Sequence, residues 1–377
     1  MIYLDYSATT PVSSEVQDTI NKVTKEFIGN ANSLNALGIK SKELLESATK
    51  QIADLFGVQP NELTYTSSST ESNNMALIGI ALNYSKRGKH IIVSKLEHPS
   101  IYAICDYLKT LGFEISYVNN NEEGLIDFDD LRRLIRKETI LVSIAAVNSE
   151  LGIRQPLKMI RQVINKLNSN TIFHSDMTQA VGKTQVNLHD VDLASISSHK
   201  IYGPKGISLL YKANNIHIVP LIYGSGKSND LKPGTPALPL IAGFSKALRI
   251  ATNDIEKKER YISLLNDKIC NYLKKYDDVK INKTKYSIPH ILNISVMNIK
   301  PETMIHAFDE EEIYLSTNTA CSSGNISNAV MAIYNDEDRA KHTIRISLSQ
   351  LTTSDEINKF LDAFSKIYDK LNSLAKR

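Results

Sequence analysis

The sequence predicts an α/β protein in which a large domain, built on a mostly parallel sheet between helices, is followed by a smaller α+β C-terminal domain. Short apolar runs alternate with amphipathic helical patterns up to about Thr252, which is typical of a parallel sheet covered by helices on both faces. Beyond Thr252 this alternation gives way to a long charged helical pattern. The 377 residues are enough for two domains.

In the predicted large domain, a first helix ends within 24–30 and a second occupies 41–57, closed by Gly57. A strand ending near Thr66 then leads through a Ser/Thr-rich turn into another helix. The remaining strands are expected at 90–94, 114–118, 139–147, 171–176 and 193–198, and the helices between them at 100–112, 128–137 and 157–168.

In the predicted small domain, a connecting helix precedes short strands and a terminal amphipathic helix with Ser354 as its N-cap. These elements are expected at 254–276 for the connecting helix, at 290–297, 312–317 and 342–349 for the strands, and at 354–374 for the last helix. We expect the large domain to comprise residues 13–254, and the small domain to comprise 1–12 with 255–377.

Composition excludes several classes of protein. The net charge of +3 is too small for this length to indicate nucleic-acid binding. The three cysteines include no CxxC pair and no His/Cys cluster, so we expect no disulfide framework, no metal site and a reduced, cytoplasmic compartment. The N-terminus lacks the pattern of a signal peptide, and no apolar run reaches the roughly 18 residues that span a membrane.

Polar side chains follow four of the predicted strands. His98, Asn148, Asp176 and the group Ser197–Lys200 each come just after an apolar run. Ligands of open α/β sheets bind beyond the carboxyl ends of the strands. We therefore expect these side chains to converge on one site.

The strand-end lysine and aspartate indicate what this site binds. Asp176 follows a buried strand and needs a cation, because an unpaired buried carboxylate is costly. Pyridoxal phosphate (PLP) requires a lysine, an acid beside its ring nitrogen and a phosphate cup. The Ser/Thr-rich turn at 66–70 opens a helix, whose N-terminal N–H groups favour an anion. Taken singly, Lys200 could be a solvated charge and the turn an ordinary N-cap; together with Asp176 they predict a PLP site.

Nine segments, in order along the chain, extend this interpretation. They are YLDYSATTP (3–11), TSSSTESNN (66–74), EHPSI (97–101), VNSELG (147–152), HSDMTQAVGK (174–183), SSHKIYGPKG (197–206), KPGT (232–235), STNTACSSG (316–324) and IRISL (344–348). Through them the sequence resembles, over nearly its whole length, the cysteine desulfurases of the NifS/IscS type. These belong to the class V, fold-type I, PLP-dependent aminotransferases. The resemblance is greatest to the subgroup that supplies sulfur for tRNA thiolation.

The resemblance implies a role for each site residue. Lys200 would carry PLP covalently and move the α-proton of the substrate, and Asp176 would pair with the ring nitrogen. His98 would stack on the ring, although a surface histidine at a helix N-terminus is the alternative. The other implied contacts are Gln179 at the phenolic oxygen, Ser69, Thr70, Ser197 and His199 at the phosphate, Asn148 near cofactor and substrate, Arg345 at the substrate carboxylate, and Thr235 at the phosphate of a neighbouring subunit. The contact from Thr235 implies a homodimer.

Cys321 lies in a Ser/Thr/Asn-rich stretch, as a mobile sulfur carrier would, although a cysteine in a polar loop can also be incidental. Cys105 and Cys270 lie on apolar helical faces and are expected in the core. The resemblance implies conversion of L-cysteine to L-alanine through a persulfide on Cys321. The persulfide would then pass to an acceptor protein, such as a tRNA-thiolating sulfurtransferase or an iron–sulfur scaffold.

Several positions depart from the family pattern. Ser149 replaces a second asparagine, and the segment 30–35 lacks a proline and a histidine. Lys227, Ser228 and Lys232 stand where the family has Gln or His, Glu and Arg, and lysine is a poor substitute for a bidentate arginine. Two alternatives therefore stay open: another class V PLP enzyme, such as an aminotransferase or a selenocysteine lyase, and a low-activity scaffold that binds a sulfur carrier.

Overall fold

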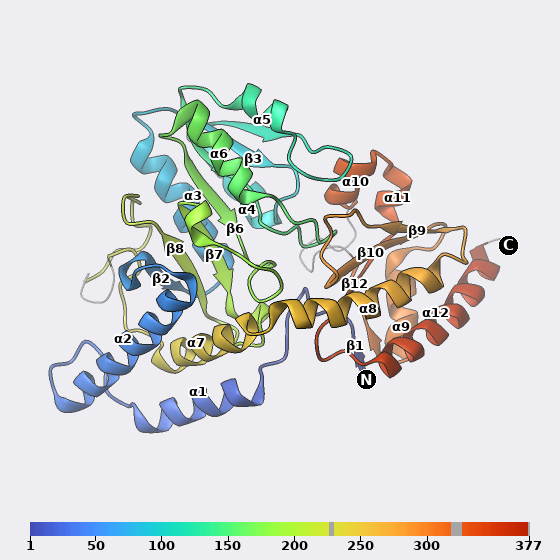
Figure 1. Ribbon diagram of the computed structural model, residues 1–377, viewed down its shortest axis with the longest axis horizontal. Helices are drawn as coiled ribbons and strands as arrows, with labels where there is room; N and C mark the ends of the chain where they lie inside the picture. Colours follow the sequence, from blue (N-terminus) through green and yellow to red (C-terminus); the bar gives the residue numbers. More distant parts are fainter. Residues whose placement is uncertain (226–229, 318–325, 376–377) are drawn as a thin grey trace.

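A seven-stranded sheet and a smaller three-stranded sheet organise the chain in the computed structural model, which describes residues 1–225, 230–317 and 326–375 (Figure 1). The large sheet has the order β2-β8-β7-β6-β5-β3-β4. Its strands are β2 (Leu63–Thr66), β3 (His90–Ser94), β4 (Glu114–Val118), β5 (Thr139–Ser143), β6 (Ile172–Asp176), β7 (Leu193–Ser197) and β8 (Ser208–Lys212). The strands β3 to β7 are parallel, and β8 is antiparallel to β7 and β2. The predicted fold class is confirmed.

Both faces of the large sheet are covered, because its strands are apolar on both sides. Ile91 and Val93 of β3 pack against α3 and α4, whereas Ile92 between them joins the cluster of α2, α5, α6 and α7. The two groups of helices lie on opposite faces (Figure 1). The helices of this part are α1 (Ser14–Glu26), α2 (Ala36–Phe56), α3 (Ser69–Tyr84), α4 (Pro99–Thr110), α5 (Phe128–Leu134), α6 (Leu157–Asn168) and α7 (Leu238–Thr252).

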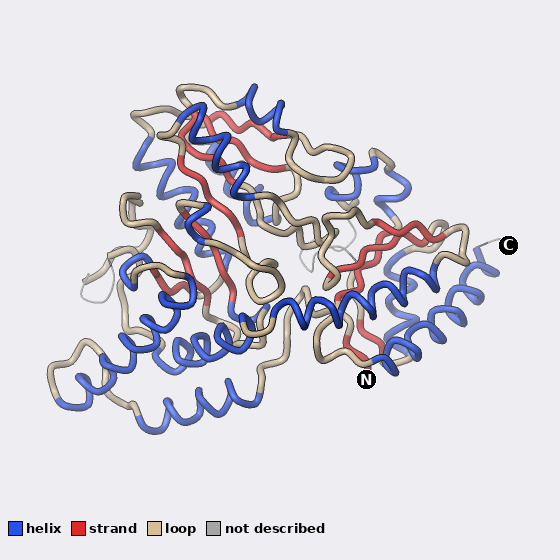
Figure 2. The backbone as a smooth tube through the Cα atoms, viewed as in Figure 1, coloured by secondary structure: helices blue, strands red, loops and turns tan. Residues whose placement is uncertain are grey.

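The three-stranded sheet is antiparallel, with β10 between β12 and β9. It packs on α8, α9 and α12 through a separate apolar cluster, and α7 and α8 run from the large sheet to the small one (Figure 2). The elements are β9 (Val279–Asn282), β10 (Ile291–Val296), β11 (Ile313–Tyr314), β12 (Thr343–Ser347), α8 (Ile255–Leu273), α9 (Pro301–Glu310), α10 (Asn328–Tyr334), α11 (Glu337–Lys341) and α12 (Ser354–Ala375). The first strand, β1 (Ile2–Tyr3), pairs in parallel with β11, so both chain ends lie in this part.

Local sequence explains where the helices begin and end. Side chains of Ser13, Asn35, Ser68 and Asp127 cap α1, α2, α3 and α5 by accepting hydrogen bonds from first-turn N–H groups. Gly57 ends α2 in the left-handed conformation, at φ 68°.

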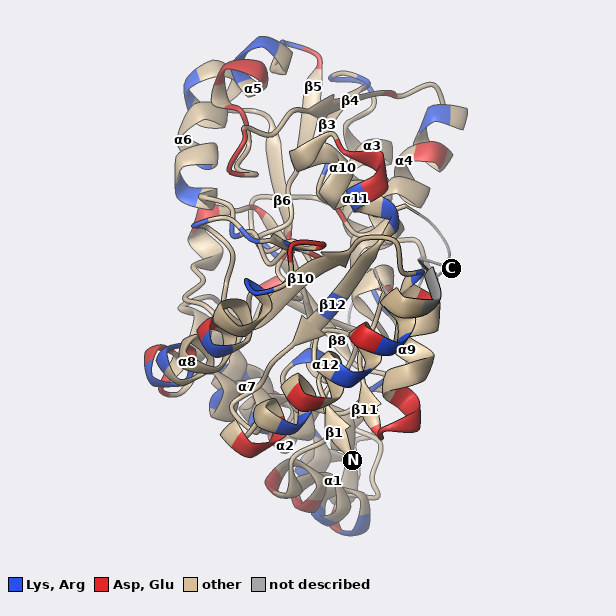
Figure 3. Cartoon of the chain, turned by 90° about the vertical axis from the view of Figure 1, so that its right-hand side faces the viewer, with Lys and Arg blue, Asp and Glu red and all other residues tan. Residues whose placement is uncertain are grey.

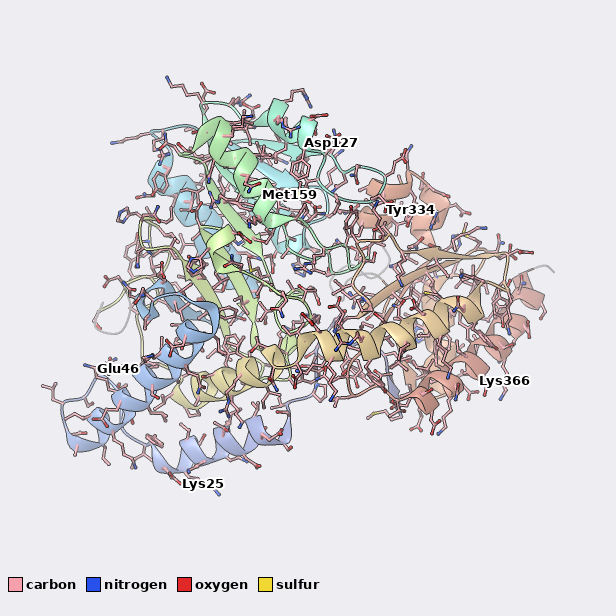
Figure 4. All side chains as sticks on the ribbon, in the orientation of Figure 1. Lys25, Glu46, Asp127, Met159, Tyr334 and Lys366 are labelled. Carbon is pink, nitrogen blue, oxygen red and sulfur yellow. The ribbon has the colours of Figure 1, made fainter. Side chains whose placement is uncertain are left out.

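The outer surface is mixed in charge and polar. Lys, Arg, Asp and Glu are interspersed over the exposed helices (Figure 3). The exposed Lys25, Glu46 and Lys366 mark the outer faces of α1, α2 and α12 (Figure 4). Among the described residues, no helix is both long enough and apolar enough to cross a membrane.

Some predicted bounds were wrong. The predicted strand at 139–147 ends as β5 at Ser143, although the Ala146 N–H still donates to the Asp176 carbonyl at 2.9 Å. The predicted strand at 312–317 shrinks to the two residues of β11. The elements that were not predicted are β1, β8, β9, α7, α9, α10 and α11. The division into domains at 13–254 and 1–12 with 255–377 stays a prediction.

Candidate active site

The carboxyl ends of the parallel strands open onto a cavity of about 260 Å³. Asp176 ends β6, Lys200 lies in a 3₁₀ turn directly after β7, and His98 caps α4 after β3. The N-terminus of α3 closes one side of the cavity, and Arg345 of β12 reaches it from the small sheet. Three of the four polar groups that were predicted to converge therefore lie at this cavity.

Lys200 points its amino group at the N-terminal segment. Its Nζ donates to the carbonyls of Ser7 at 2.5 Å and Ala8 at 2.7 Å. The Ser7 N–H in turn donates to Ser347 Oγ of β12 at 2.9 Å. Ser7 and Ala8 line the cavity, yet sequence reasoning did not select them. The segment YLDYSATTP was the only signal, and it gave no role for these two residues.

Asp176 is buried and holds its carboxylate at the base of the cavity. Its Oδ2 accepts from Asn73 Nδ2 and its Oδ1 from the Thr178 N–H, both at 2.9 Å. Over the described ranges, no basic side chain forms a salt bridge with it. A buried carboxylate with neutral donors retains room for a cation supplied by a ligand.

His98 lies in the cavity wall, so the alternative of a solvated surface histidine does not fit. Its Nδ1 shares a hydrogen bond with Ser100 Oγ at 3.0 Å, which fixes the ring. Burial, with a further contribution from Lys200, lowers the pKa of His98, while Asp176 opposes this shift. The imidazole is therefore neutral at neutral pH, which suits stacking on a flat ring.

One end of the cavity is built to receive an anion. Ser68 caps the 16-residue helix α3, whose first-turn N–H groups at Ser69 and Thr70 have no acceptor within the helix. Ser69 Oγ accepts from Thr178 Oγ1 at 2.8 Å, which orients the turn. His199 lines the same cavity, and burial, then Lys200, lowers the pKa of His199 to about 4. Ser197 also lines the cavity.

Arg345 is almost fully buried, with 2% of its surface exposed, and its guanidinium faces the cavity. Nη1 donates to the Ser149 carbonyl at 3.1 Å and Nη2 to Asp5 Oδ1 at 3.0 Å. These two contacts hold the planar fork in place, where it can receive a carboxylate.

Asn148 and Thr235 are not brought into the cavity wall. The Asn148 side chain donates to the Leu96 carbonyl at 3.0 Å and accepts from the N–H groups of Glu150 and Leu151. It therefore braces the chain after β3, and a direct contact of its side chain with a ligand would need these bonds to break. Thr235 is exposed and accepts a long hydrogen bond of 3.5 Å from Asn30.

Three of the positions singled out from sequence, Cys321, Lys227 and Ser228, lie outside the described residues. Lys232 forms an ion pair with Glu71 in the first turn of α3, so this lysine holds a carboxylate despite the departure from arginine. The same carboxylate accepts from the Ser67 N–H and so supports the turn that opens α3.

Glu97 is a site residue that sequence reasoning missed, although it lies inside the segment EHPSI. Its Oε1 accepts from the Ala145 N–H at 2.7 Å, which joins the chain after β3 to the chain after β5. Burial raises the pKa of Glu97 well above its ordinary value, and this carboxyl group braces the chain next to His98.

The donor set fits PLP. The Lys200 amine, the buried Asp176 carboxylate and the α3 N-terminus meet the three requirements of that cofactor within one cavity. Gln179 adds a side-chain amide to the same wall. The cavity is also large enough for a small amino acid beside Arg345.

Comparisons with known proteins agree with this chemistry. The family model described as aminotransferase class-V matches residues 2–360. The chain is 37% identical over 380 residues to the cysteine desulfurase IscS of Dictyoglomus turgidum, covering 99% of this chain and 96% of that protein. The solved structure of a NifS-like protein superposes with a TM-score of 0.92 at 32% identity, covering 98% and 99% of the two chains. A structure described as SspA in complex with cysteine gives a TM-score of 0.81 at 29% identity, covering 94% and 100%.

Proposed function

The chain belongs to the class-V aminotransferase family as a PLP-dependent cysteine desulfurase of the NifS/IscS type, and we propose that it passes the sulfur of L-cysteine through Cys321 to an acceptor protein. The observation that carries the proposal is the meeting of Lys200, Asp176 and the α3 N-terminus in one cavity faced by Arg345. That set of groups serves amino-acid chemistry on PLP, and a scaffold without activity has no use for it.

The residues of the chain divide the work at the α-carbon. PLP, when bound, supplies an electron sink for the bond that breaks at the substrate α-carbon. Asp176 would keep the ring nitrogen protonated, and His98 would cover the ring face. Lys200 would hold the cofactor and then accept the α-proton at its Nζ. Arg345 would bind the substrate carboxylate through its fork.

Sulfur transfer is assigned to Cys321. Its thiolate would attack the substrate sulfur, the carbon–sulfur bond would break, and the sulfur would stay on the enzyme as a persulfide while alanine leaves. Both flanks of the stretch that contains Cys321 support this proposal. The Arg345 N–H donates to the Ser316 carbonyl at 2.8 Å, and Ser327 Oγ donates to Glu150 Oε2 at 2.5 Å, so each flank is tied beside the cavity.

We also propose that the active form is a homodimer in which Thr235 contacts the phosphate of the neighbouring subunit. Ile28 and Leu34 support a covered surface here, because they are 76% and 94% exposed and flank Asn30, the hydrogen-bond partner of Thr235. Light scattering combined with PLP titration measures this directly: tight PLP binding by a monomer would contradict the shared site.

The acceptor is proposed to be a sulfur-carrier protein of tRNA thiolation, with an iron–sulfur scaffold as the second candidate. This part rests on the sequence resemblance, and the proposed cytoplasmic location rests on the cysteine content. The deciding experiment incubates purified PLP-loaded protein with L-cysteine and measures alanine and sulfide, with and without each acceptor. Equal amounts of alanine and transferred sulfur are expected. Amino-group transfer without sulfur release would favour the aminotransferase alternative, and a preference for selenocysteine would favour the lyase.

A further inference from the structure

Lys183 is a buried lysine for which the proposed reaction has no use. It is 8% exposed, and over the described part of the chain no carboxylate forms an ion pair with it. Burial, then the positive charges of Lys200 and Arg345, lowers the pKa of Lys183 well below its ordinary value. An apolar side chain would fill this space at less electrostatic cost. Within the described ranges the Lys183 amine has one side-chain partner, and this partner must explain why a lysine is present.

That partner is the amide of Gln179. The Lys183 Nζ donates to Gln179 Oε1, and Gln179 Nε2 donates to the Ser7 carbonyl at 2.9 Å. A carbonyl can only accept, and the Lys183 amine is the donor on the other side. Both partners therefore require the same orientation of the Gln179 amide, with Oε1 toward Lys183 and Nε2 toward Ser7. Without such partners, the oxygen and nitrogen of an amide are hard to distinguish.

This orientation decides what Gln179 presents to the cavity. The carboxamide has two N–H groups, and the Ser7 carbonyl accepts from one of them. Gln179 lines the cavity, so its second N–H is available to an acceptor there. With the amide reversed, a carbonyl oxygen would face the cavity and repel any acceptor atom of a ligand.

We infer that Lys183 is a positioning residue, which holds the carbonyl of Gln179 so that the amide N–H groups face Ser7 and the phenolic oxygen of PLP. The inference rests on the proposed PLP site. Lys183 acts through Gln179 and needs no contact with cofactor or substrate. Among the described residues, the charges that act on Lys183 are those of Lys200 and Arg345, and neither is an acid that its amine would neutralise.

The test is a double-mutant cycle on PLP binding by the apoprotein. Lys183→Met keeps the length of the side chain and removes the donor, so the amide of Gln179 can reverse. The Kd of PLP should rise about fivefold, the effect of weakening one hydrogen bond. The pH midpoint of the lysine-bound cofactor absorbance should rise, since a donor to the phenolic oxygen is weakened. In a Gln179→Leu background, Lys183→Met should change neither quantity further.

The matched control is Lys212→Met. Lys212 is half-buried and donates to the backbone carbonyls of Ala213 and Ile216, away from the cavity, so PLP binding should be unchanged. If Lys183→Met fails to fold, Lys183→Gln replaces it in the cycle. The glutamine side chain is one bond shorter than that of lysine, so its amide ends short of Gln179.

The possible results separate the inference from the proposed function. Equal effects of Lys183→Met with and without the Gln179 side chain, or no effect at all, would overturn the inference while the PLP site stands. Failure of the wild-type apoprotein to take up PLP would overturn the proposed function, and this inference with it.

Discussion

Replacing Asp176 with asparagine should reduce the stability of the apoprotein less than it reduces the activity of the enzyme. In the native site, the carboxylate accepts from Asn73 Nδ2 and from the Thr178 N–H. An asparagine oxygen can accept from only one of them, and its new NH₂ group would face the other donor. Asn73 can relieve this, because its Oδ1 is buried without a hydrogen bond and can rotate toward the NH₂ group. The cost is the 3.2 Å bond from Asn73 Nδ2 to Ser100 Oγ, about 1 kcal/mol.

The effect on activity should be larger than the effect on folding. A neutral amide cannot form the charge-assisted hydrogen bond to the ring nitrogen, a loss of about 1.5–3 kcal/mol or one to two decades in rate. PLP should remain bound, since Lys200 and the α3 N-terminus are untouched. Alanine formation from L-cysteine gives the rate, and thermal unfolding of the apoprotein gives the stability. Asp130→Asn is the control, because Asp130 is equally buried and accepts from the Asn119 N–H far from the cavity. Near-normal turnover of the Asp176 variant would refute the assigned role.

Further substitutions test the lysine and cysteine roles, and one tests a buried histidine of β6. Lys200→Ala should remove both the absorbance of lysine-bound PLP and all alanine formation; residual conversion would show that another group carries the cofactor. Cys321→Ser should still bind PLP and shift its spectrum with L-cysteine, yet mass spectrometry should find no added sulfur on the protein. Cys105→Ser and Cys270→Ser should keep sulfur transfer, because burial raises the pKa of both thiols. Burial lowers the pKa of His174 to about 4 in the folded protein, so the unfolded chain binds a proton first and stability falls as the pH drops from about 6.5 to 4. His174→Gln should reduce the loss between pH 7 and 5 by about 2 kcal/mol in urea unfolding, and an unchanged pH dependence would contradict this.

The sequence predicted the site residues whose positions depend on the end of one strand alone. Asp176 and Lys200 follow buried apolar runs, and the end of such a run fixes where the side chain lies. Asn148 follows the same kind of run but turns back to Leu96, because its side chain satisfies three backbone groups that the bend exposes. No local pattern distinguishes these two outcomes.

Groups that meet across the fold could not be predicted from the chain. The Ser7 carbonyl accepts from Lys200, which lies 193 residues away, and Arg345 pairs with Asp5 across 340 residues. Such pairs depend on how the two sheets are placed, which periodicity does not encode. The missed strand β8 is a similar case: it pairs antiparallel to β7 in a sheet otherwise predicted as parallel, so strand–helix alternation gave no sign of it.

The pairing of β1 with β11, and of Ser7 with Ser347, sets an order of events during biosynthesis. Residues 2–7 are made early and wait for partners that are translated much later. At about 5–20 residues per second, the 340 residues between Ser7 and Ser347 take roughly 20–70 seconds to translate. The seven-stranded sheet can form in this interval, but Ser7 gains its hydrogen bond to β12 only afterwards. A nascent chain therefore lacks both the anchor of Ser7 to β12 and the Arg345 guanidinium of the same strand until the small sheet has been made.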